Sequence, residues 1–480
     1  MTTITIPDTS PYPPPGQPFA TARRLMADLF SDGEDYTLVS WRGDFWRFNG
    51  AHWEMVGDEL EIKAPLWEKL DQATYVTADH EVKPWNPTKS KVAGLLEPMA
   101  VANYIPAVCD APVWDDGRSG RGIIAMDNGL FNLATRRLDP HTPRLFSTWG
   151  LSFDYDDTAQ CPTWLSFLES IFSHDPKAVD ALQEYMGYLI SGETNQHKAL
   201  MMIGAPRAGK STISTVVQAL MGYANVATTS LHDLGSEFGL GALVGKPLTV
   251  IEDARDGGPV GRGVVERLLS IVANDSMSVN RKNLDYWNGR LNTRLIVASN
   301  EVPRLPDASG AILNRFITIR FVRSFSEDEQ DKQLKGRLLK ELPGIFNWAL
   351  AGLDRLHAQG RFTAPESSGE LEATFSELAE PLQVFMDECD AFEITGDHGD
   401  CMDASTMLGL YRAWTNLEGR QRLNRESLAS KITAMYPTVK YVNAQRNDAG
   451  EYDPTAKKRR MYLGVKPINN PHRWMVSGAA

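Results

Sequence analysis

The segment GAPRAGKS, residues 204–211, constrains the fold more than any other part of this 480-residue chain. It fits the pattern G-x-x-x-x-G-K-[ST], in which glycines let successive backbone N–H groups turn inward toward a phosphate. The apolar run ALMMI precedes this segment, and the helical pattern KSTISTVVQALMG begins at its last two residues. A strand, a glycine-rich loop and a helix in this order predict a phosphate cradle at the positive end of a helix.

Each position of the predicted cradle has a physical reason. Gly204 and Gly209 allow the backbone to curl, Lys210 is expected to reach the β- and γ-phosphates, and Ser211 can place its hydroxyl on Mg²⁺. The alternative is a glycine-rich turn that only opens an ordinary helix, and the strand and helix on either side disfavour it. The predicted nucleotide-binding residues are Gly204, Ala205, Pro206, Arg207, Ala208, Gly209, Lys210, Ser211 and Thr212.

Two later apolar segments each end in polar residues. LTVIED ends in Glu252 and Asp253, and LIVASN ends in Asn300. Ligands bind at the carboxyl ends of strands in parallel sheets, so one acid is expected to hold Mg²⁺ and the other to orient or deprotonate the attacking water. Asn300 is expected to hold that water without adding negative charge. The alternatives are a solvated acid pair and a plain strand end.

Arg315, in the segment LNRF, completes the predicted catalytic set. Its guanidinium can stabilise the negative charge that grows on the γ-phosphate, and in ring ATPases this group comes from the neighbouring subunit. Arg320 and Arg323 are nearby alternatives. The predicted catalytic residues are Lys210, Glu252, Asp253, Asn300 and Arg315, and the predicted metal-binding residues are Ser211, Glu252 and Asp253.

The periodicity of the whole chain predicts an α/β fold. After residue 198, strands alternate with helices, which predicts a P-loop ATPase core with a mainly parallel sheet flanked by helices. Residues 161–192 read as two helices. The predicted domains are a flexible lead over 1–20, an α+β N-terminal domain over 21–192, the ATPase domain over 193–365 and a winged-helix-like C-terminal domain over 375–480.

The N-terminal domain is rich in tryptophan. Its alternating run YTLVSWRGDFWRFNGAHWEMV predicts a hairpin around Asn49-Gly50. Trp41, Trp46 and Trp53 are expected to pack a small sheet, because aromatic residues suit half-buried strands. Stacking on nucleic-acid bases is the alternative for these rings.

Charge, cysteines and hydropathy limit the class of protein. The net charge of −12 argues against a coat of positive potential, but basic loops inside a channel remain compatible with it. No apolar run approaches the ~18 residues of a spanning helix, and the N-terminus lacks a secretory signal. We expect a cytoplasmic protein without membrane contact, in the bacterial host cytoplasm if it is phage-encoded. Without a CxxC pair, neither a zinc site nor a disulfide framework is expected from Cys109, Cys161, Cys389 and Cys401.

In their order and spacing, these segments resemble superfamily 3 helicases, and among them the poxvirus-type and phage or plasmid primase-helicases. GAPRAGKS resembles their Walker A motif, LTVIED their Walker B motif, LIVASNEVPRLPD their motif C, and SVNRKN the B′ element that ends in a DNA-contacting hairpin. Upstream, MDNGLFNLATRRLDPHTP and LQEYMGYLISG resemble the domain that precedes the ATPase. Two features depart from the family. Walker B begins its acid pair with Glu252, and nothing resembles a primase polymerase module, so primer synthesis is not expected.

The resemblance implies an AAA+-like core in a hexameric ring, with ATP and Mg²⁺ between subunits and one DNA strand through the centre. It places Arg281 and Lys282 in channel loops as phosphate contacts, with Tyr286 or Trp287 available for base stacking. An ordinary solvated turn is the alternative for these loops. The basic residues 457–460 can contact duplex DNA or only solvate a hairpin tip.

The function that follows is an ATP-dependent DNA helicase of phage, plasmid or mobile-element replication, which translocates on single-stranded DNA as a ring. Single-stranded and forked DNA are the expected partners, with a separate primase or initiator as a further one. Two alternatives remain open. One is an ATP-dependent initiator that binds an origin with little processive unwinding, and the other is an ATP-switched assembly or defence scaffold.

Overall fold

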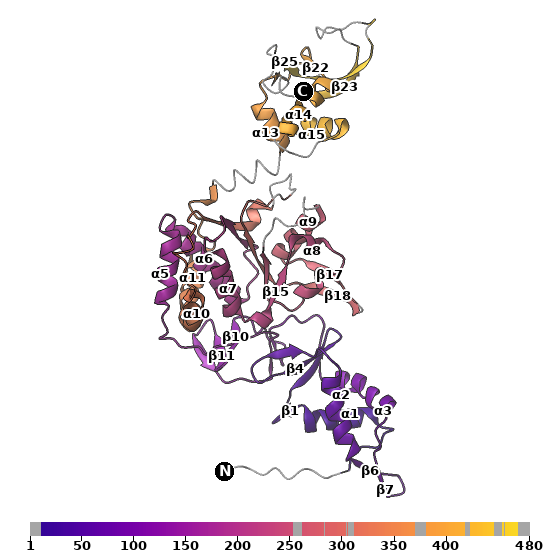
Figure 1. Ribbon diagram of the computed structural model, residues 1–480. Helices are drawn as coiled ribbons and strands as arrows, with labels where there is room; N and C mark the ends of the chain where they lie inside the picture. Colours follow the sequence, from indigo (N-terminus) through magenta and orange to yellow (C-terminus); the bar gives the residue numbers. More distant parts are fainter. Residues whose placement is uncertain are drawn as a thin grey trace. The chain divides into compact units, whose positions relative to one another are not determined.

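The computed structural model divides the chain into two compact units, Met1–Glu372 and Ala373–Ala480 (Figure 1). Each unit is described by itself, and the domain boundaries given above remain predictions. The structure describes residues 11–252, 262–282, 284–303, 305, 312–369, 381–417, 423–445, 454–455 and 457–468.

The first unit opens with a small helical cluster and a four-stranded sheet in the order β5-β4-β3-β8. Within the predicted lead, Tyr12 is buried in this cluster and the first helix begins at Pro18. The helices are α1 (Pro18–Leu29), α2 (Leu60–Asp71), α3 (Lys89–Ala93) and α4 (Leu96–Ala102). The four strands are β3 (Leu38–Trp41), β4 (Asp44–Phe48), β5 (Trp53–Met55) and β8 (Tyr104–Ile105). Shorter strands are β1 (Ser31–Asp32), β2 (Asp35–Tyr36), β6 (Thr74–Val76), β7 (Val82–Pro84), β9 (Val113–Trp114) and β13 (Leu145–Phe146).

The three tryptophans of this sheet are buried, which confirms the packing interpretation over base stacking. The rings of Trp41, Trp46 and Trp53 lie 5.3–5.7 Å from the ring of Phe146, in edge-on or tilted contacts. Aromatic pairs favour such arrangements over face-to-face stacking. The rings are therefore part of the sheet's own core.

Along the chain, a three-stranded sheet and two helices follow this four-stranded sheet and precede the cradle. The two predicted helices are present, and Gly192 ends the second in the left-handed conformation, with φ 71°. Glycine adopts this conformation at little cost, which explains the position of the helix end. The elements are β10 (Ile123–Met126), β11 (Gly129–Asn132), β12 (Arg137–Asp139), α5 (Pro162–Phe172) and α6 (Pro176–Ser191).

A five-stranded parallel sheet in the order β15-β16-β19-β14-β20 organises the rest of the first unit. Its strands are short and mostly apolar, as expected for a sheet covered on both faces. The elements are β14 (Ala199–Gly204), α7 (Lys210–Met221), β15 (Val226–Thr229), α8 (Leu231–Gly235), β16 (Leu248–Glu252), α9 (Arg262–Ala273), β17 (Ser276–Arg281), β18 (Leu284–Arg290), β19 (Arg294–Ser299), β20 (Phe316–Phe321), α10 (Leu334–Leu338) and α11 (Leu342–Gln359).

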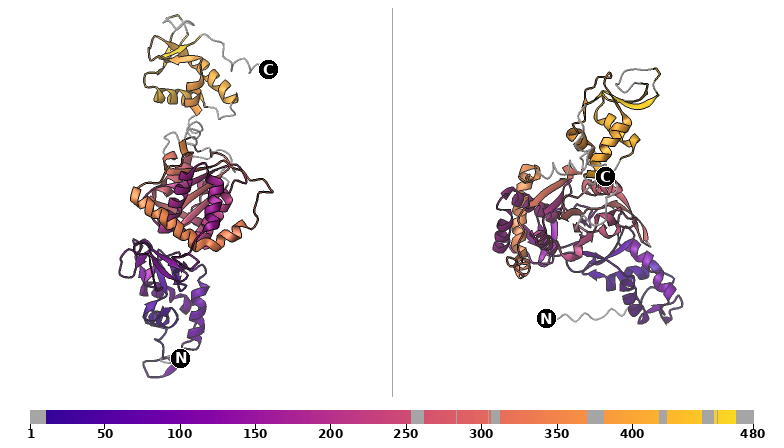
Figure 2. Two further views of the ribbon diagram at one scale, coloured as in Figure 1. Left: turned by 90° about the vertical axis from the view of Figure 1, so that its left-hand side faces the viewer. Right: turned by 45° about the horizontal axis from the view of Figure 1, so that its top comes forward.

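The strand order also decides which helices cover which face. The connection through α7 runs from the fourth strand position to the first, whereas that through α9 runs from the second position to the third. Parallel crossovers are right-handed, so connections that run in opposite directions place their helices on opposite faces. Figure 1 shows α7 and α9 on opposite sides of the sheet, and Figure 2 gives two further views.

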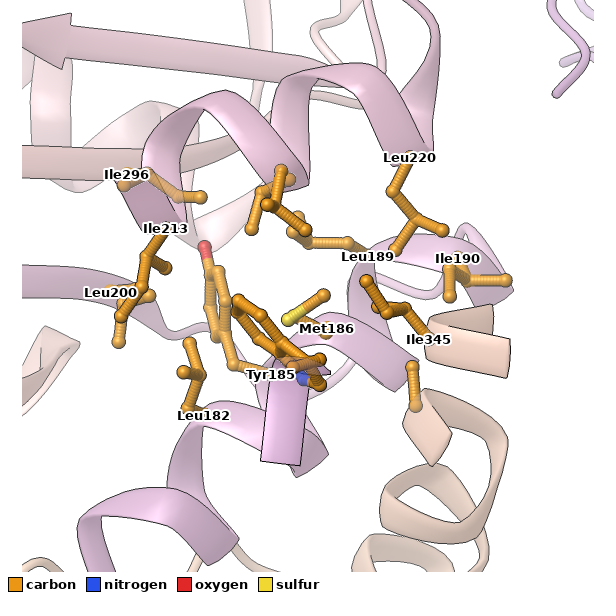
Figure 3. Packing of buried hydrophobic residues seen from close by; sticks show 14 of the residues in the cluster. Leu182, Tyr185, Met186, Leu189, Ile190, Leu200, Ile213, Leu220, Ile296 and Ile345 are labelled. Carbon is orange, nitrogen blue, oxygen red and sulfur yellow. The ribbon is translucent and has the colours of Figure 1, made fainter. Parts of the chain in front are cut away.

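The largest core lies between this sheet, α6, α7 and α11 (Figure 3). The Tyr185 hydroxyl of α6 donates to the carbonyl of Leu295 in β19 at 2.7 Å, because a buried hydroxyl needs a partner. Glycines let α6 and α11 approach closely. A Cβ on Gly187 would lie 2.4 Å from the carbonyl oxygen of Ala349, and one on Gly352 would lie 2.4 Å from that of Gln183.

The second unit combines three described helices with small antiparallel sheets. Strands β23 and β24 form a hairpin beside β22, and β21 pairs with β25. The basic residues 457–460 are exposed at this hairpin, and the winged-helix assignment remains a prediction. The elements are α13 (Pro381–Glu388), β21 (Phe392–Ile394), β22 (Cys401–Asp403), α14 (Ala404–Leu417), α15 (Arg425–Met435), β23 (Lys440–Ala444), β24 (Arg459–Leu463) and β25 (Val465–Pro467).

All four cysteines are free thiols. Burial, with the nearby Glu341 carboxylate, raises the pKa of the Cys161 thiol to about 11, so this thiol is protonated at neutral pH. None of the helices in the described part of the chain is both long and apolar enough to cross a membrane.

Substituting Gly187→Ala tests the α6–α11 contact. The added methyl group has no space between the helices, so we expect the free energy of unfolding of the first unit to fall by about 1–3 kcal/mol. Urea unfolding followed by tryptophan fluorescence measures this change. Gly336→Ala in α10, where a Cβ meets nothing within 4 Å, is the matched control and should be neutral or slightly stabilising. Equal stability of Gly187→Ala and wild type would contradict the packing.

Candidate nucleotide-binding site

The loop between β14 and α7 has the shape that its glycines require. Gly204 lies so close to β20 that a Cβ would be 2.2 Å from the carbonyl oxygen of Phe321. Gly209 has φ 98°, in the left-handed region, and a Cβ there would lie 2.6 Å from Ile171 Cδ1 in α5. Both positions therefore need glycine, as the sequence pattern predicts.

The exposed part of the loop is attached to the segment that follows β20. Ser324 Oγ donates to the carbonyl of Pro206 at 2.8 Å, and the backbone N–H of Phe325 donates to that of Arg207 at 3.0 Å. Arg207 itself has φ 62°, which is uncommon for a residue other than glycine. These two bonds hold a strained loop conformation in place.

Lys210 links the cradle to the end of β19. Its side chain is buried, and Nζ donates to the carbonyls of Gly204 and Ala205 and to Asn300 Oδ1, the last two at 2.9 Å. A buried ammonium group must be hydrogen-bonded, and phosphate oxygens can replace these neutral oxygens as acceptors. The contact brings two of the predicted catalytic residues together.

Parallel pairing brings three strand ends to one edge of the sheet. Ile203 of β14 pairs with Ser299 of β19, and Ala298 pairs with Glu252 of β16. Glu252, Asn300 and the cradle therefore meet at the carboxyl edge, as predicted. Asp253, the other predicted acid, lies outside the described residues.

The Glu252 carboxylate lies beside the helix that the cradle opens. Its Oε1 accepts from Ser214 Oγ at 3.4 Å, and Ser214 is three residues after Ser211 on α7. Glu252 and Ser211 are both exposed. A hydroxyl and a carboxylate are oxygen ligands of the kind that Mg²⁺ takes. The side chains of Ser211 and Glu252 therefore fit a hydrated magnesium ion.

Arg315 lies at the opposite edge of the same sheet. It ends a short 3₁₀ turn just before β20, where Phe316 pairs with Ala199, while Phe321 pairs with Gly204 at the cradle. These two pairs are five residue steps apart along β20, and at the rise of a strand the distance between them is about 16 Å. Arg315 is therefore too far from the cradle of its own chain to touch a phosphate there.

Arg320 and Arg323 lie at the cradle edge instead. Arg320 pairs with Ile203 in the sheet. Arg323 donates to the carbonyl of Ser170 at 3.1 Å and pairs with Glu329 at 3.3 Å. These alternatives to Arg315 therefore lie near their own chain's cradle.

The hairpin of β17 and β18 carries the predicted DNA-contacting residues. Lys282 is exposed, and 62 % of Tyr286 is accessible, whereas Trp287 is buried. Neighbouring side chains on a strand point to opposite faces, so only one of the two rings can face outward. Of the two rings predicted as alternatives for base stacking, Trp287 is therefore inaccessible in this structure, and stacking by Tyr286 remains a prediction. Arg281 is largely covered, in an ion pair with Asp44.

Comparison with known proteins adds two family matches and a fold likeness. Residues 23–173 match a family model described as D5 N terminal like, and residues 202–315 match a family of unknown function, DUF5906. Two solved structures of an NrS-1 C-terminal region in the apo state resemble this fold, with TM-scores of 0.53 and 0.50. Both are 12 % identical in sequence, and each alignment covers 89 % of this chain and 95 % of the other. At this identity the likeness concerns the fold alone.

A thermal-shift measurement tests the site directly. MgATP should raise the unfolding midpoint of the first unit, because a ligand that binds only the folded state stabilises it by about 2.7 kcal/mol at a hundred times its Kd. Lys210→Ala should abolish the shift, and Lys335→Ala, on the exposed side of α10, should retain it. A shift that persists in Lys210→Ala would place the nucleotide elsewhere.

Proposed function

We propose that this chain is an ATP-dependent DNA helicase of the phage or plasmid replication type. The observation that carries the proposal is the convergence of Lys210, Glu252 and Asn300 on one glycine-built loop at the carboxyl edge of a parallel sheet. The match to the D5 N terminal like model and the fold likeness to the NrS-1 C-terminal region are compatible with the family resemblance of the sequence.

In this proposal the residues of the cradle would carry out the steps of ATP hydrolysis. The loop N–H groups and Lys210 would hold the phosphates, and a bound Mg²⁺ would neutralise charge on the β- and γ-oxygens. Ser211 and Glu252, with Asp253 next to Glu252 in sequence, would hold that ion and its water shell. Asn300 would orient the attacking water, because its amide accepts and donates hydrogen bonds without adding charge.

The position of Arg315 supports a ring. An arginine at the opposite edge of the sheet can serve an ATP site only in another copy of the chain, and a head-to-tail ring supplies such a copy at every interface. The guanidinium of one subunit would then stabilise the transition-state charge in the next subunit. This geometry favours the multi-subunit ATPase over a monomeric nucleotide-binding protein.

The hairpin supplies the proposed contact with DNA. Lys282 and Tyr286 combine a cation for backbone phosphates with an exposed ring for base stacking, the two features of sequence-independent single-strand binding. Arg281 adds a second cation. The hairpin directly precedes β19, whose end carries Asn300, so the DNA contact and the ATP site lie on one continuous segment.

Unwinding of a forked duplex tests the proposal. Wild type should separate the strands with MgATP, Lys210→Ala should not, and Lys282→Ala with Tyr286→Ala should lose unwinding while it keeps nucleotide binding. Lys335→Ala is the control for loss of an exposed lysine. Tight binding to one duplex sequence without any unwinding would favour an origin-binding initiator. ATP binding without DNA binding would favour an assembly scaffold.

Mixing two inactive variants tests the position of Arg315. Lys210→Ala and Arg315→Ala should each abolish ATP turnover. In randomly mixed rings about a quarter of the interfaces would join an intact Lys210 to an intact Arg315, so turnover should return. Absence of any recovery, with mixed assembly verified by exchange of labelled subunits, would contradict a role between subunits.

A further inference from the structure

The tip of the β17–β18 hairpin is attached to the N-terminal sheet at the turn between β3 and β4. Arg281 Nη1 lies 3.1 Å from Asp44 Oδ2, and only 13 % and 25 % of the two side chains are exposed. On the other side of the hairpin, Asn280 Nδ2 donates to Glu237 Oε1 at 3.0 Å. The predicted DNA-contacting cation is thus held by a carboxylate from a distant part of the chain.

A second contact fixes the same turn against the hairpin. The Arg42 guanidinium lies 4.4 Å from the ring centre of Trp41 and 5.5 Å from that of Trp287, and it donates to Asp110 at 2.7 Å. A guanidinium between two indole faces is attracted by both. This contact holds Asp44, two residues further along the chain, beside Arg281.

The backbone is shaped for this close approach. Arg42 has φ 52°, a conformation that is uncommon for arginine, and such strain persists where the surroundings enforce it. A Cβ on Gly289 would lie 2.9 Å from Arg42 Nη1. The turn and the hairpin therefore fit each other through a strained residue on one side and a required glycine on the other.

The electrostatic consequence concerns the anion that Arg281 binds. A carboxylate and a phosphate both accept charge-assisted hydrogen bonds from the same guanidinium N–H groups. With Asp44 in place, Arg281 presents little surface to a phosphate, whereas Lys282 and Tyr286 are open to solvent. Asp44 also places a negative charge where the DNA backbone would lie.

We propose that Asp44 is a competing anion, which holds Arg281 in the DNA-free chain until a backbone phosphate of single-stranded DNA takes its place. The proposal rests on the proposed function, because it assumes that the hairpin binds DNA. Lys282 and Tyr286 would make the first contact, and the exchange at Arg281 would then free the hairpin from the N-terminal sheet. The N-terminal domain would thereby restrain the DNA-binding hairpin.

Fluorescence anisotropy of a labelled oligothymidylate, titrated with the full chain at fixed salt, tests the exchange. Asp44→Asn removes the charge but keeps an oxygen that can accept from Arg281, and it should tighten DNA binding about fivefold. Glu68→Gln, an exposed position on α2, makes the same change in net charge and should leave the affinity unchanged. Arg281→Ala should weaken binding.

The double variant separates competition from simple repulsion. In the Arg281→Ala background, Asp44→Asn should have no further effect on affinity. A gain that persists in that background would mean that Asp44 only repels DNA, and weaker binding by Asp44→Asn would make it a positioning contact. Either result overturns the proposal.

If Arg281→Ala weakens binding and Asp44→Asn changes nothing, the competition fails while the helicase proposal stands. If Arg281→Ala, Lys282→Ala and Tyr286→Ala all leave DNA affinity unchanged, the DNA-binding role of the hairpin itself fails.

Discussion

The candidate site depends on the parallel pairing of β16, β19 and β14. This pairing sets three strand ends side by side at one edge, and no single segment could assemble them. The strands are held in register by apolar side chains on both faces and by α6 and α7, which pack in the same core. The polar residues that end the strands are consequently the groups that a ligand at this edge would meet. A shift of one strand by one residue would separate Lys210 from Asn300.

The buried ammonium of Lys210 would prepare the site for the proposed nucleotide. In the structure it is satisfied by neutral oxygens of Gly204, Ala205 and Asn300, which can be exchanged for phosphate oxygens without leaving a buried charge unpaired. The exchange would also release Asn300 from Lys210. A neutral amide freed in this way is the group that the proposed mechanism needs beside the attacking water. In the proposed mechanism the contact between Lys210 and Asn300 would therefore couple the position of Asn300 to nucleotide binding.

Much of the core was predictable from the sequence, because its signals are local. Short apolar runs followed by the glycine loop, by two acids and by an amide predicted β14, β16 and β19, and glycines predicted where α6 and α7 end. The edge of the sheet at which each residue lies followed from the rule that parallel strands share direction. Sequence spacing could not place Arg315, since its distance from the cradle depends on the register of β20 with β14.

Contacts between distant segments escaped prediction. Asp44 and Arg281 are 237 positions apart, and neither position has a local pattern that points to the other. The turn at Arg42 was missed because arginine rarely adopts positive φ, whereas the Asn49-Gly50 turn has a recognisable sequence. The contact of Arg42 with the Trp287 ring, which helps to bury that ring, was equally out of reach of local sequence patterns. A Gly two residues after an aromatic residue in a strand, as at Gly289, is the one sequence feature that points to close approach.

ATP hydrolysis by the full chain, measured with Mg²⁺ in the presence and absence of single-stranded DNA, tests the central claim most directly. The convergence of Lys210, Glu252 and Asn300 predicts magnesium-dependent turnover, and the hairpin joined to β19 predicts that single-stranded DNA accelerates it. Turnover that is absent under both conditions, at protein concentrations where the chain assembles, would contradict the account.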